Sequence, residues 1–509
     1  FMDKIDTINE DIDCIMSVSA TKDDFWKSDD KMILSRLLED APRRQQDRQP
    51  LYIENSAIYI TRVSSLKNYN SINPIIKTVT GHDLFGQIKG VTTDSREAID
   101  GDLYIALEGS VNDGHSYLDE VDALNVAAVL INKDKGSSNL KAQKIEVTDT
   151  KKTLGDISKE WRRKFDIPVI GITGSNGKTS TKDLLYHVLK KKYNVHLTRG
   201  NYNTSIGLPL TMLEINDSHE ISIVEMGANQ VGDIEYLCAL AKPTHGLITN
   251  VSSAHLEGFG NIDNIIKTKG ALFEALKNGV SFVNYADDKV KNAHKLGKKI
   301  TYGLNEICDF PADIHHDKDG SIILTIDSQE IHTQSQNLSF AKNIIAVASI
   351  AITLGIKWNH FQERILSYQP PRGRCEVSKY DKITVIDDTY NSNLESCSAA
   401  IDYLKAFSGK GRNIVVLGDM LELGKASEEQ HRNLGYKCSS SNLDAIFTLG
   451  ENAFFIKESI RGIQKNHHFE FRQDLIDSLK LELKDNDTVL FKGSRGMKME
   501  KIIEGVFGK

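Results

Sequence analysis

Short apolar runs alternate with helical segments over much of the chain, beginning near residue 166. Each run is followed by a polar cluster and then by apolar residues at helical spacing. This order is typical of a parallel α/β sheet, which binds its ligands at the carboxyl ends of its strands. The strands predicted from the first three runs are residues 168–172, 221–224 and 246–249.

A second series of apolar runs begins near residue 380. Pro370 and Pro371 separate the two series, and paired prolines resist both helix and strand. We therefore predict a domain boundary at this position. The strands predicted for the second series are residues 383–386, 414–417, 445–448 and 488–491.

The chain before residue 166 divides into two parts that differ in composition and in the pattern of apolar residues. Residues 77–165 show short strands and helices, whereas residues 1–76 are charged. Within that charged part, the alternating run 51–60 is typical of a strand pair broken at Asn55-Ser56. We therefore predict an N-terminal extension followed by three domains, at residues 1–76, 77–165, 166–369 and 370–509.

Composition narrows the class of protein. The 509 residues are 40% hydrophobic and 26% charged, with a formal net charge of −7. This balance lacks the basic footprint of a protein that binds nucleic acid or an anionic membrane. No apolar run approaches the ~20 residues of a membrane helix, and the six cysteines are scattered without metal-ligand spacing. We expect a cytoplasmic protein.

The segment from Gly171 to Ser180 carries the clearest chemical signal. It lies between a predicted strand and a predicted helix, and its glycines precede Lys178 and Thr179. Glycines let backbone N–H groups surround phosphate oxygens, a helix N-terminus adds a positive dipole, lysine neutralises phosphate charge and threonine can bind Mg²⁺. The spacing departs from the common phosphate loop, because Ile172 stands where glycine is usual. The predicted ATP ligands are Gly174, Ser175, Asn176, Gly177, Lys178, Thr179 and Ser180.

Three further residues near strand ends are candidates for the chemistry. Glu225 ends an apolar run, where its carboxylate is well placed to bind Mg²⁺. His255 follows another run, but a lone loop histidine is more often structural or exposed. Lys269 lies in a predicted helix and, by spacing alone, is typical of a surface lysine.

Together these segments resemble the Mur ligases. Residues 173–179 are similar to the TGTNGKT phosphate loop of that family, which accounts for the unusual glycine spacing. The resemblance extends from about residue 88 to the end of the chain. It implies an α/β architecture of three domains: a nucleotide-sugar domain, a central parallel-sheet ATPase domain and a Rossmann-like C-terminal domain that binds the incoming amine. The other matching blocks are residues 200–211, 225–228, 248–260, 387–393, 416–424 and 492–497.

The resemblance implies roles for individual residues. In the family, the matching glutamate and loop threonine hold one Mg²⁺, and the matching histidine holds a second. A lysine carbamylated by CO₂ helps to position the second ion, and Lys269 falls on it. The resemblance thus implies catalytic roles for Lys178, Glu225, His255 and Lys269, and metal binding by Thr179, Glu225, His255 and Lys269.

The same resemblance implies further binding residues and shows where this chain departs from the family. Residues 337–343 stand where the family has its adenine-side segment, and only the final asparagine, Asn343, is retained. Ala271 and Leu394 replace a usual glutamate and proline. The implied ATP-binding residues are Asn343, Arg374 and Asp388. The implied substrate-binding residues are Ser95, Arg96, Asp113, His115, Asn201, Asn203, Tyr390, Asn391, Asn393 and Lys492.

Three functions are compatible with these features. The first is an ATP-dependent ligase that adds D-alanyl-D-alanine to UDP-N-acetylmuramoyl-tripeptide, through an acyl phosphate, in peptidoglycan synthesis. The second attaches an amino acid to a CMP- or UDP-linked sugar acid for a surface polysaccharide, and the third is a non-catalytic nucleotide-binding scaffold. In the first two, the partners are a nucleotide-linked sugar precursor and an amino acid or dipeptide. The family implies a monomer.

The N-terminal extension carries a second resemblance. Residues 43–60 are similar to an internal piece of CMP-sialic acid synthetases, with Ser56 in place of a glycine. The extension lacks the nucleotide-binding loop of that family, so we expect no cytidylyltransferase activity from it. The resemblance favours the second function, a ligase in a CMP-sugar pathway.

Overall fold

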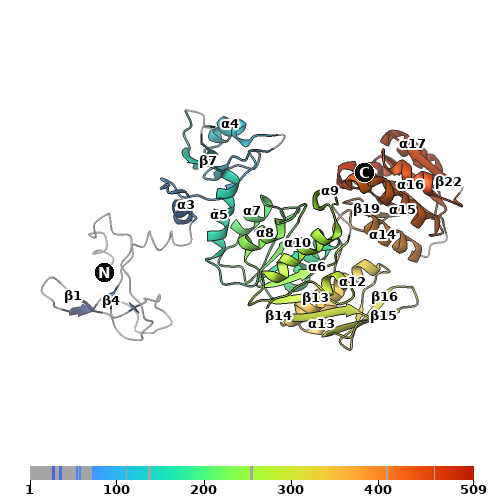
Figure 1. Ribbon diagram of the computed structural model, residues 1–509, viewed down its shortest axis with the longest axis horizontal. Coiled ribbons are helices and arrows are strands. Elements are labelled where there is room, and N and C mark those ends of the chain that lie inside the picture. The colour runs from blue at the N-terminus through green and yellow to red at the C-terminus, as the bar shows by residue number, and fades with distance from the viewer. Residues whose placement is uncertain are drawn as a thin grey trace. The chain divides into compact units, whose positions relative to one another are not determined.

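The computed structural model describes most of the chain from residue 72 onward (Figure 1). Before that, it gives the backbone of two antiparallel strand pairs, β1 (Trp26–Ser28) with β2 (Leu34–Arg36) and β3 (Ile53–Glu54) with β4 (Ala57–Ile58). The pairing of β3 with β4 agrees with the predicted strand pair, although Asn55 and Ser56 lie outside the described residues. The continuous description covers residues 72–109, 112–133, 135, 139–252, 256–407, 411–463 and 465–508.

The chain forms two compact units, Phe1–Thr153 and Leu154–Lys509. In the described part of the first unit, a parallel sheet has the order β5-β6-β7-β8. Four successive residues of β7 are fully buried, because both faces of this strand are covered. The elements of this unit are α3 (Asn73–Thr80), β5 (Val91–Thr92), β6 (Leu103–Ile105), α4 (Leu118–Ala123), β7 (Ala128–Asn132), β8 (Gln143–Val147) and the start of α5 (Thr150–Arg162).

The central sheet of the second unit contains, among the described residues, nine strands in the order β10-β11-β9-β12-β13-β14-β15-β16-β17. The pairings from β10 to β15 are parallel, as predicted, and those of β15 with β16 and β16 with β17 are antiparallel. The strands are β9 (Val169–Thr173), β10 (Val195–Leu197), β11 (Ile221–Glu225), β12 (His245–Ile248), β13 (Val280–Asn284), β14 (Lys298–Leu304), β15 (Phe310–His316), β16 (Ile322–Ile326) and β17 (Gln329–His332).

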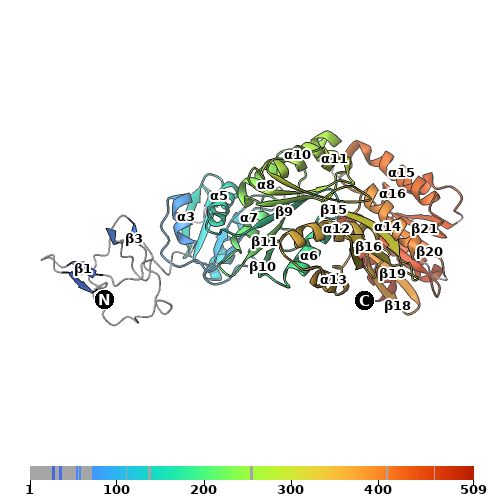
Figure 2. The ribbon, with the colours of Figure 1, turned by 90° about the horizontal axis from the view of Figure 1, so that it is seen from below.

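Helices cover both faces of this sheet, as Figure 2 shows. Ile170 and Ile172 of β9 face the core that includes α6 and α12, whereas Val169 faces the core that includes α8 and α10. A strand buried on both faces needs the continuous apolar run seen in the sequence. The helices are α6 (Lys178–Leu189), α7 (Gly207–Leu213), α8 (Asp233–Ala241), α9 (Leu256–Phe259), α10 (Ile262–Glu274), α11 (Asp288–Lys291), α12 (Leu338–Thr353) and α13 (Trp358–Leu366).

The C-terminal sheet has, in the described residues, the strand order β18-β19-β23-β20-β21-β22. Only the β18–β19 pairing is antiparallel among these, and the others are parallel. The elements are β18 (Glu376–Tyr380), β19 (Ile383–Asp388), α14 (Leu394–Ala406), β20 (Asn413–Gly418), α15 (Ser427–Ser439), β21 (Ala445–Leu449), α16 (Ala453–Ser459), β22 (Lys465–Phe469), α17 (Arg472–Glu482), β23 (Thr488–Lys492) and α18 (Glu500–Phe507). Within the described part, no helix is both long and apolar enough to cross a membrane.

Candidate ATP site and its surroundings

The loop between β9 and α6 needs glycine at two positions. Gly174 has a φ of +148°, and a Cβ there would lie 1.9 Å from Thr249 Oγ1. Gly177 is the N-cap of α6 with a φ of +80°, and a Cβ there would lie 3.1 Å from Asn343 Oδ1. Because larger residues rarely adopt such φ values, only glycine fits both positions without strain. The loop therefore closes tightly at the N-terminus of α6, where phosphate binds.

The segment after β12 holds this loop in place. Thr249 Oγ1 donates to Asn176 O over 2.6 Å, and Asn176 N donates to Asn250 Oδ1 over 3.0 Å. Ser252 N donates to Ser175 Oγ over 2.9 Å. Sequence analysis did not assign these supporting residues to the site. The signal that marks them is the polar cluster that follows the apolar run of β12, one strand away from the glycine loop.

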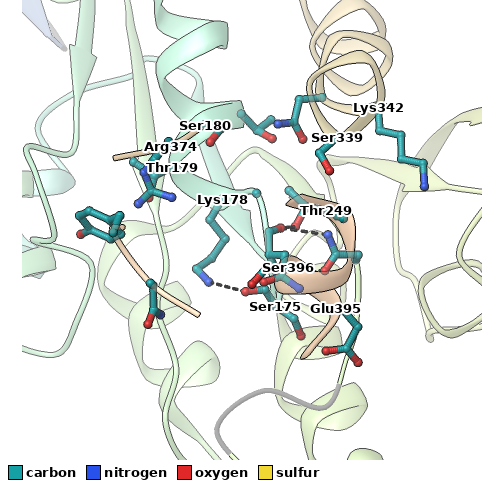
Figure 3. A pocket seen from close by; sticks show the side chains of 18 of the residues that line it. Ser175, Lys178, Thr179, Ser180, Thr249, Ser339, Lys342, Arg374, Glu395 and Ser396 are labelled. Carbon is teal, nitrogen blue, oxygen red and sulfur yellow. Dashed lines mark hydrogen bonds between the residues drawn. The ribbon is translucent and has the colours of Figure 1, made fainter. Parts of the chain in front are cut away.

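Two lysines converge on the loop, one half-buried (Lys178) and one buried (Lys269). Lys178 Nζ donates to Gly174 O over 2.9 Å and to Ser175 O over 3.2 Å, and Figure 3 shows its side chain extending toward Ser175. Lys269 is 3% exposed, and its Nζ donates to the same Gly174 carbonyl over 3.1 Å. Burial, together with the charge of Lys178, holds the pKa of Lys269 well below its usual range. Burial also lowers the pKa of Lys178, opposed by the charge of Glu225.

The Glu225 carboxylate lies at the end of β11. Glu225 is 2% exposed, and its Oε1 accepts a hydrogen bond of 2.7 Å from Asn203 Nδ2. Its Oε2 is buried and has no hydrogen-bond partner among the residues that the structure describes. Asn203, predicted to bind substrate, is thus placed to orient Glu225. His255 lies outside the described residues, and Asn201 lies exposed in the segment before Asn203.

A cavity of about 1400 Å³ opens beside these groups within the second unit. Residues of the glycine loop, Glu225, Thr179 and Ser180 line it, together with residues of α12 such as Lys342 and Asn343 (Figure 3). On the α12 side, Phe340 stacks on Tyr368 with ring centroids 5.7 Å apart, and the Tyr368 hydroxyl is buried without a partner. The volume is ample for a nucleotide.

The same cavity is lined by predicted site residues of the C-terminal sheet. The Arg374 guanidinium lies 4.0 Å from the centroid of the Tyr390 ring. Lys492 Nζ donates to Asp388 Oδ2 over 2.5 Å and to Asn391 O over 2.9 Å. The carboxylate of Asp388 and the ammonium of Lys492 therefore form an ion pair inside the protein.

Asn393 connects the C-terminal part to the glycine loop. Its Oδ1 accepts from Ser396 N over 2.9 Å, which caps α14, and its Nδ2 donates to Asn176 Oδ1 over 2.7 Å. Both polar atoms of this side chain are thus hydrogen-bonded to protein groups. Sequence analysis predicted that Asn393 binds substrate, and the structure places it as a cap and as a bond to the loop.

The predicted substrate residues of the first unit differ in exposure. The Arg96 side chain is 84% exposed and donates a hydrogen bond to the Asp94 carboxylate, whereas Ser95 is buried. His115 Nδ1 lies 2.6 Å from Asp113 Oδ1, and Asn132 N donates to His115 Nε2. The hydrogen bond from His115 lowers the pKa of Asp113 to about 2. Because both ring nitrogens of His115 are used, its contacts position Asp113 and β7, and Arg96 is the more exposed of the two side chains.

Comparison with known proteins identifies the family. The Mur ligase middle domain matches residues 172–351, and the Mur ligase glutamate ligase domain matches residues 373–495. UDP-N-acetylmuramoyl-tripeptide–D-alanyl-D-alanine ligase of Bacillus subtilis is 34% identical over 82% of this chain and 93% of that protein. The chain belongs to the Mur ligase family. It is therefore an ATP-dependent ligase that joins an acid to an amino acid, as predicted.

Solved structures extend the match of this Mur ligase to three dimensions. A crystal structure of MurF from Acinetobacter baumannii has a TM-score of 0.77 at 27% identity, and it covers 86% of this chain and 98% of its own. MurF ligase from Thermotoga maritima, solved in complex with ADP, has a TM-score of 0.73 at 29% identity and covers 82% and 97% of the two chains. These likenesses confirm the predicted three-domain Mur ligase fold and support ATP binding by this Mur ligase.

Proposed function

We propose that this Mur ligase adds D-alanyl-D-alanine to UDP-N-acetylmuramoyl-tripeptide in peptidoglycan synthesis. The match to the Bacillus subtilis ligase, over nearly all of that protein, is the observation that carries the proposal. The geometry supports it, because the glycine loop and Glu225 line one cavity that residues of the C-terminal part also line, and Lys269 donates a hydrogen bond to the Gly174 carbonyl of that loop. Both substrates are large and polar, in keeping with that cavity.

The first step forms an acyl phosphate. A carboxylate oxygen of the tripeptide attacks the γ-phosphorus of ATP, the bond to the β–γ bridging oxygen breaks, and ADP leaves. Charge repulsion between the carboxylate and the phosphates opposes this approach, so positive groups fixed at the site supply the main catalytic effect. Lys178 and the backbone N–H groups at the start of α6 would provide them from this chain.

The second step forms the amide bond. The amine of D-alanyl-D-alanine attacks the acyl carbon, the carbon–oxygen bond to phosphate breaks, and the nitrogen releases a proton. Water must be excluded because it would hydrolyse the acyl phosphate. We assign the amine to the C-terminal part, where Tyr390 and Asn391 line the cavity, and the nucleotide sugar to the first unit through Arg96 and Asp113.

The residues present fit the Mg²⁺ ions that the family implies. The unpartnered, buried Oε2 of Glu225 is a hard oxygen donor beside the cavity, which is the ligand type that Mg²⁺ prefers. Glu225 and Thr179 would hold the first ion, and His255 with a carbamylated Lys269 the second. Bound Mg²⁺ would offset the charge on the phosphates.

Lys269 fits the carbamate that the family implies. Burial lowers the pKa of the Lys269 amine and so raises its neutral fraction, and only a neutral amine can attack the carbon of CO₂. The new nitrogen–carbon bond would release one proton and turn the neutral amine into an anion next to Lys178. The domain boundaries, a monomeric state and a cytoplasmic location remain parts of the proposal.

Product analysis tests the proposal. The full chain is incubated with MgATP, bicarbonate, UDP-N-acetylmuramoyl-tripeptide and D-alanyl-D-alanine, and mass spectrometry is combined with measurement of ADP. We expect a pentapeptide product and one ADP for each bond formed. A product formed instead from a CMP- or UDP-linked sugar acid and an amino acid would replace the substrates and keep the chemistry. ADP formation with no acceptor dependence would contradict both.

A further inference from the structure

Lys182 and Asp183 of α6 have no role in the chemistry proposed above, yet they lie next to its metal ligands. The Lys182 side chain is 3% exposed, in a helix whose other buried residues are apolar apart from Thr181. Lysine is almost never buried to this extent without a partner. Asp183 lies one helical turn beyond Thr179, so the two share a helix face.

The Lys182 ammonium lies between two carboxylates. Its Nζ is 3.2 Å from Asp183 Oδ1 and 4.0 Å from Glu225 Oε2. A hydrogen bond of 2.9 Å to Thr198 O fixes the side chain at this position. Thr198 also supports Glu225 directly, because Glu225 N donates to its hydroxyl over 3.0 Å. Lys182 thus joins α6, the end of β10 and the end of β11 under the glycine loop.

The positive charge of Lys182 stabilises the buried Glu225 Oε2. A buried carboxylate oxygen without a donor is costly, and 4.0 Å to Lys182 is too long for a hydrogen bond. At that distance, however, attraction between opposite charges is strong in a buried environment. Asp183 carries the opposite type of charge to Lys182 and lies 3.2 Å from the same ammonium. Lys182 and Asp183 therefore have electrostatic effects of opposite sign on the Glu225 carboxylate.

We propose that Lys182 and Asp183 are positioning residues that set the affinity of the Glu225 site for a divalent cation, Lys182 lowering it and Asp183 raising it. The inference rests on the proposed function, which places Mg²⁺ at Glu225 and Thr179. A positive charge 4.0 Å from a ligand oxygen repels an incoming cation, and a nearby carboxylate attracts it. An affinity limited in this way favours entry of the metal together with ATP and its departure with ADP.

Mn²⁺ binding tests the inference without any measurement of activity. Mn²⁺ takes the same oxygen ligands as Mg²⁺, and its electron paramagnetic resonance signal reports the free ion. Titrations use the full chain without nucleotide and again with ADP. We expect K182M to tighten Mn²⁺ binding by about threefold or more, D183N to weaken it by about as much, and the double variant to return close to the original affinity. The matched control is K190M, at an exposed lysine that follows α6.

The outcomes separate electrostatic tuning from simple support of the fold. If both single variants weaken Mn²⁺ binding, or neither changes it, the inference is wrong. K182R retains the charge and should bind Mn²⁺ like the original chain, and D183N decides the sign if K182M does not fold in a thermal unfolding assay. E225Q tests the proposed function itself: if Mn²⁺ binding is unchanged in E225Q, the metal assignment fails, whatever Lys182 does.

Discussion

Lys269 in the central part and Lys492 in the C-terminal part are equally buried, each 3% exposed, but their surroundings differ. Lys269 Nζ has a hydrogen bond to one backbone carbonyl and lies near another amine, and its pKa falls well below the usual range. Burial, the largest single cause, lowers the pKa of Lys492, but the Asp388 carboxylate 2.5 Å away together with the neighbouring Cys397 and Cys375 raises it, and the net pKa lies above the usual value. A buried amine without a counter-ion has a lowered pKa and can react as a nucleophile. A buried amine with a counter-ion instead forms an ion pair whose loss destabilises the fold.

The largest effect is expected at Lys178, the half-buried lysine of the glycine loop. Replacement by alanine in K178A removes the cation nearest to the loop carbonyls, and ADP formation should fall by about 1000-fold, as for loss of a positioned transition-state donor. Coupled ADP release measures the rate. The K190A variant, at an exposed position, should be unaffected. Activity retained in K178A would refute the assignment of the phosphate loop.

Lys492 should have the largest effect on stability. K492M leaves the Asp388 carboxylate without its ion pair in a buried position, which typically costs about 3–5 kcal/mol. The double variant K492M/D388L removes both charges and should recover much of that loss. Urea unfolding, followed by a probe in the C-terminal part, measures the difference. An equal loss in the two variants would show that packing, and not the ion pair, makes Lys492 important.

K269M sharpens the comparison because the same substitution should have the opposite consequence. Methionine replaces an amine that has no counter-ion, so stability should stay within about 1 kcal/mol or rise, while ligation is lost. Bicarbonate should stimulate the original chain and have no effect on K269M. If K269M destabilises the protein as much as K492M, the distinction between the two lysines is wrong.

The pH dependence of stability should separate the same two lysines. The pKa of Lys269 is lower in the folded protein, so the unfolded chain binds more protons, and stability rises with pH up to about 10.4, the unfolded value. The pKa of Lys492 is raised, so its contribution is complete below about 10.4 and is lost only above it. Thermal unfolding from pH 7 to 10 in CO₂-free buffer should show a difference between the original chain and K269M that changes with pH. The difference from K492M should stay constant over that range.

The sequence predicts the strands and the loop that carry this site better than the contacts between its side chains. Strands β9, β11 and β12 follow from continuous apolar runs, and the glycine loop follows from residues that lie next to each other in the chain. The bond between Lys492 and Asp388 joins residues 104 positions apart, so no local pattern contains it. The antiparallel strands β16 and β17 were not predicted either, because their short alternating runs are weak signals.

Charged residues on apolar helix faces are the signal that sequence analysis overlooked. Lys182 shares the face of Leu185 and Leu189, where a core residue is expected. A charge at such a position implies a buried partner, but the sequence does not reveal which one. The partner became apparent only when β11 placed Glu225 beside α6. Similarly, the resemblance assigns Asn203 to the substrate, and only the folded structure shows its bond to Glu225.

The smallest expected effects extend the comparison from charged groups to neutral ones. The Tyr368 hydroxyl is buried without a partner, whereas the Tyr104 hydroxyl donates to Gly114 O over 3.0 Å. Y368F should leave stability unchanged or raise it by up to about 1 kcal/mol, and Y104F should cost about 1 kcal/mol. Thermal unfolding of both variants, with and without ADP, measures this. Because Tyr368 lines the cavity, a smaller ADP-induced shift in Y368F alone would mean that its hydroxyl binds the nucleotide. Burial without a protein partner would then mark a ligand contact in tyrosine, as we propose for Glu225.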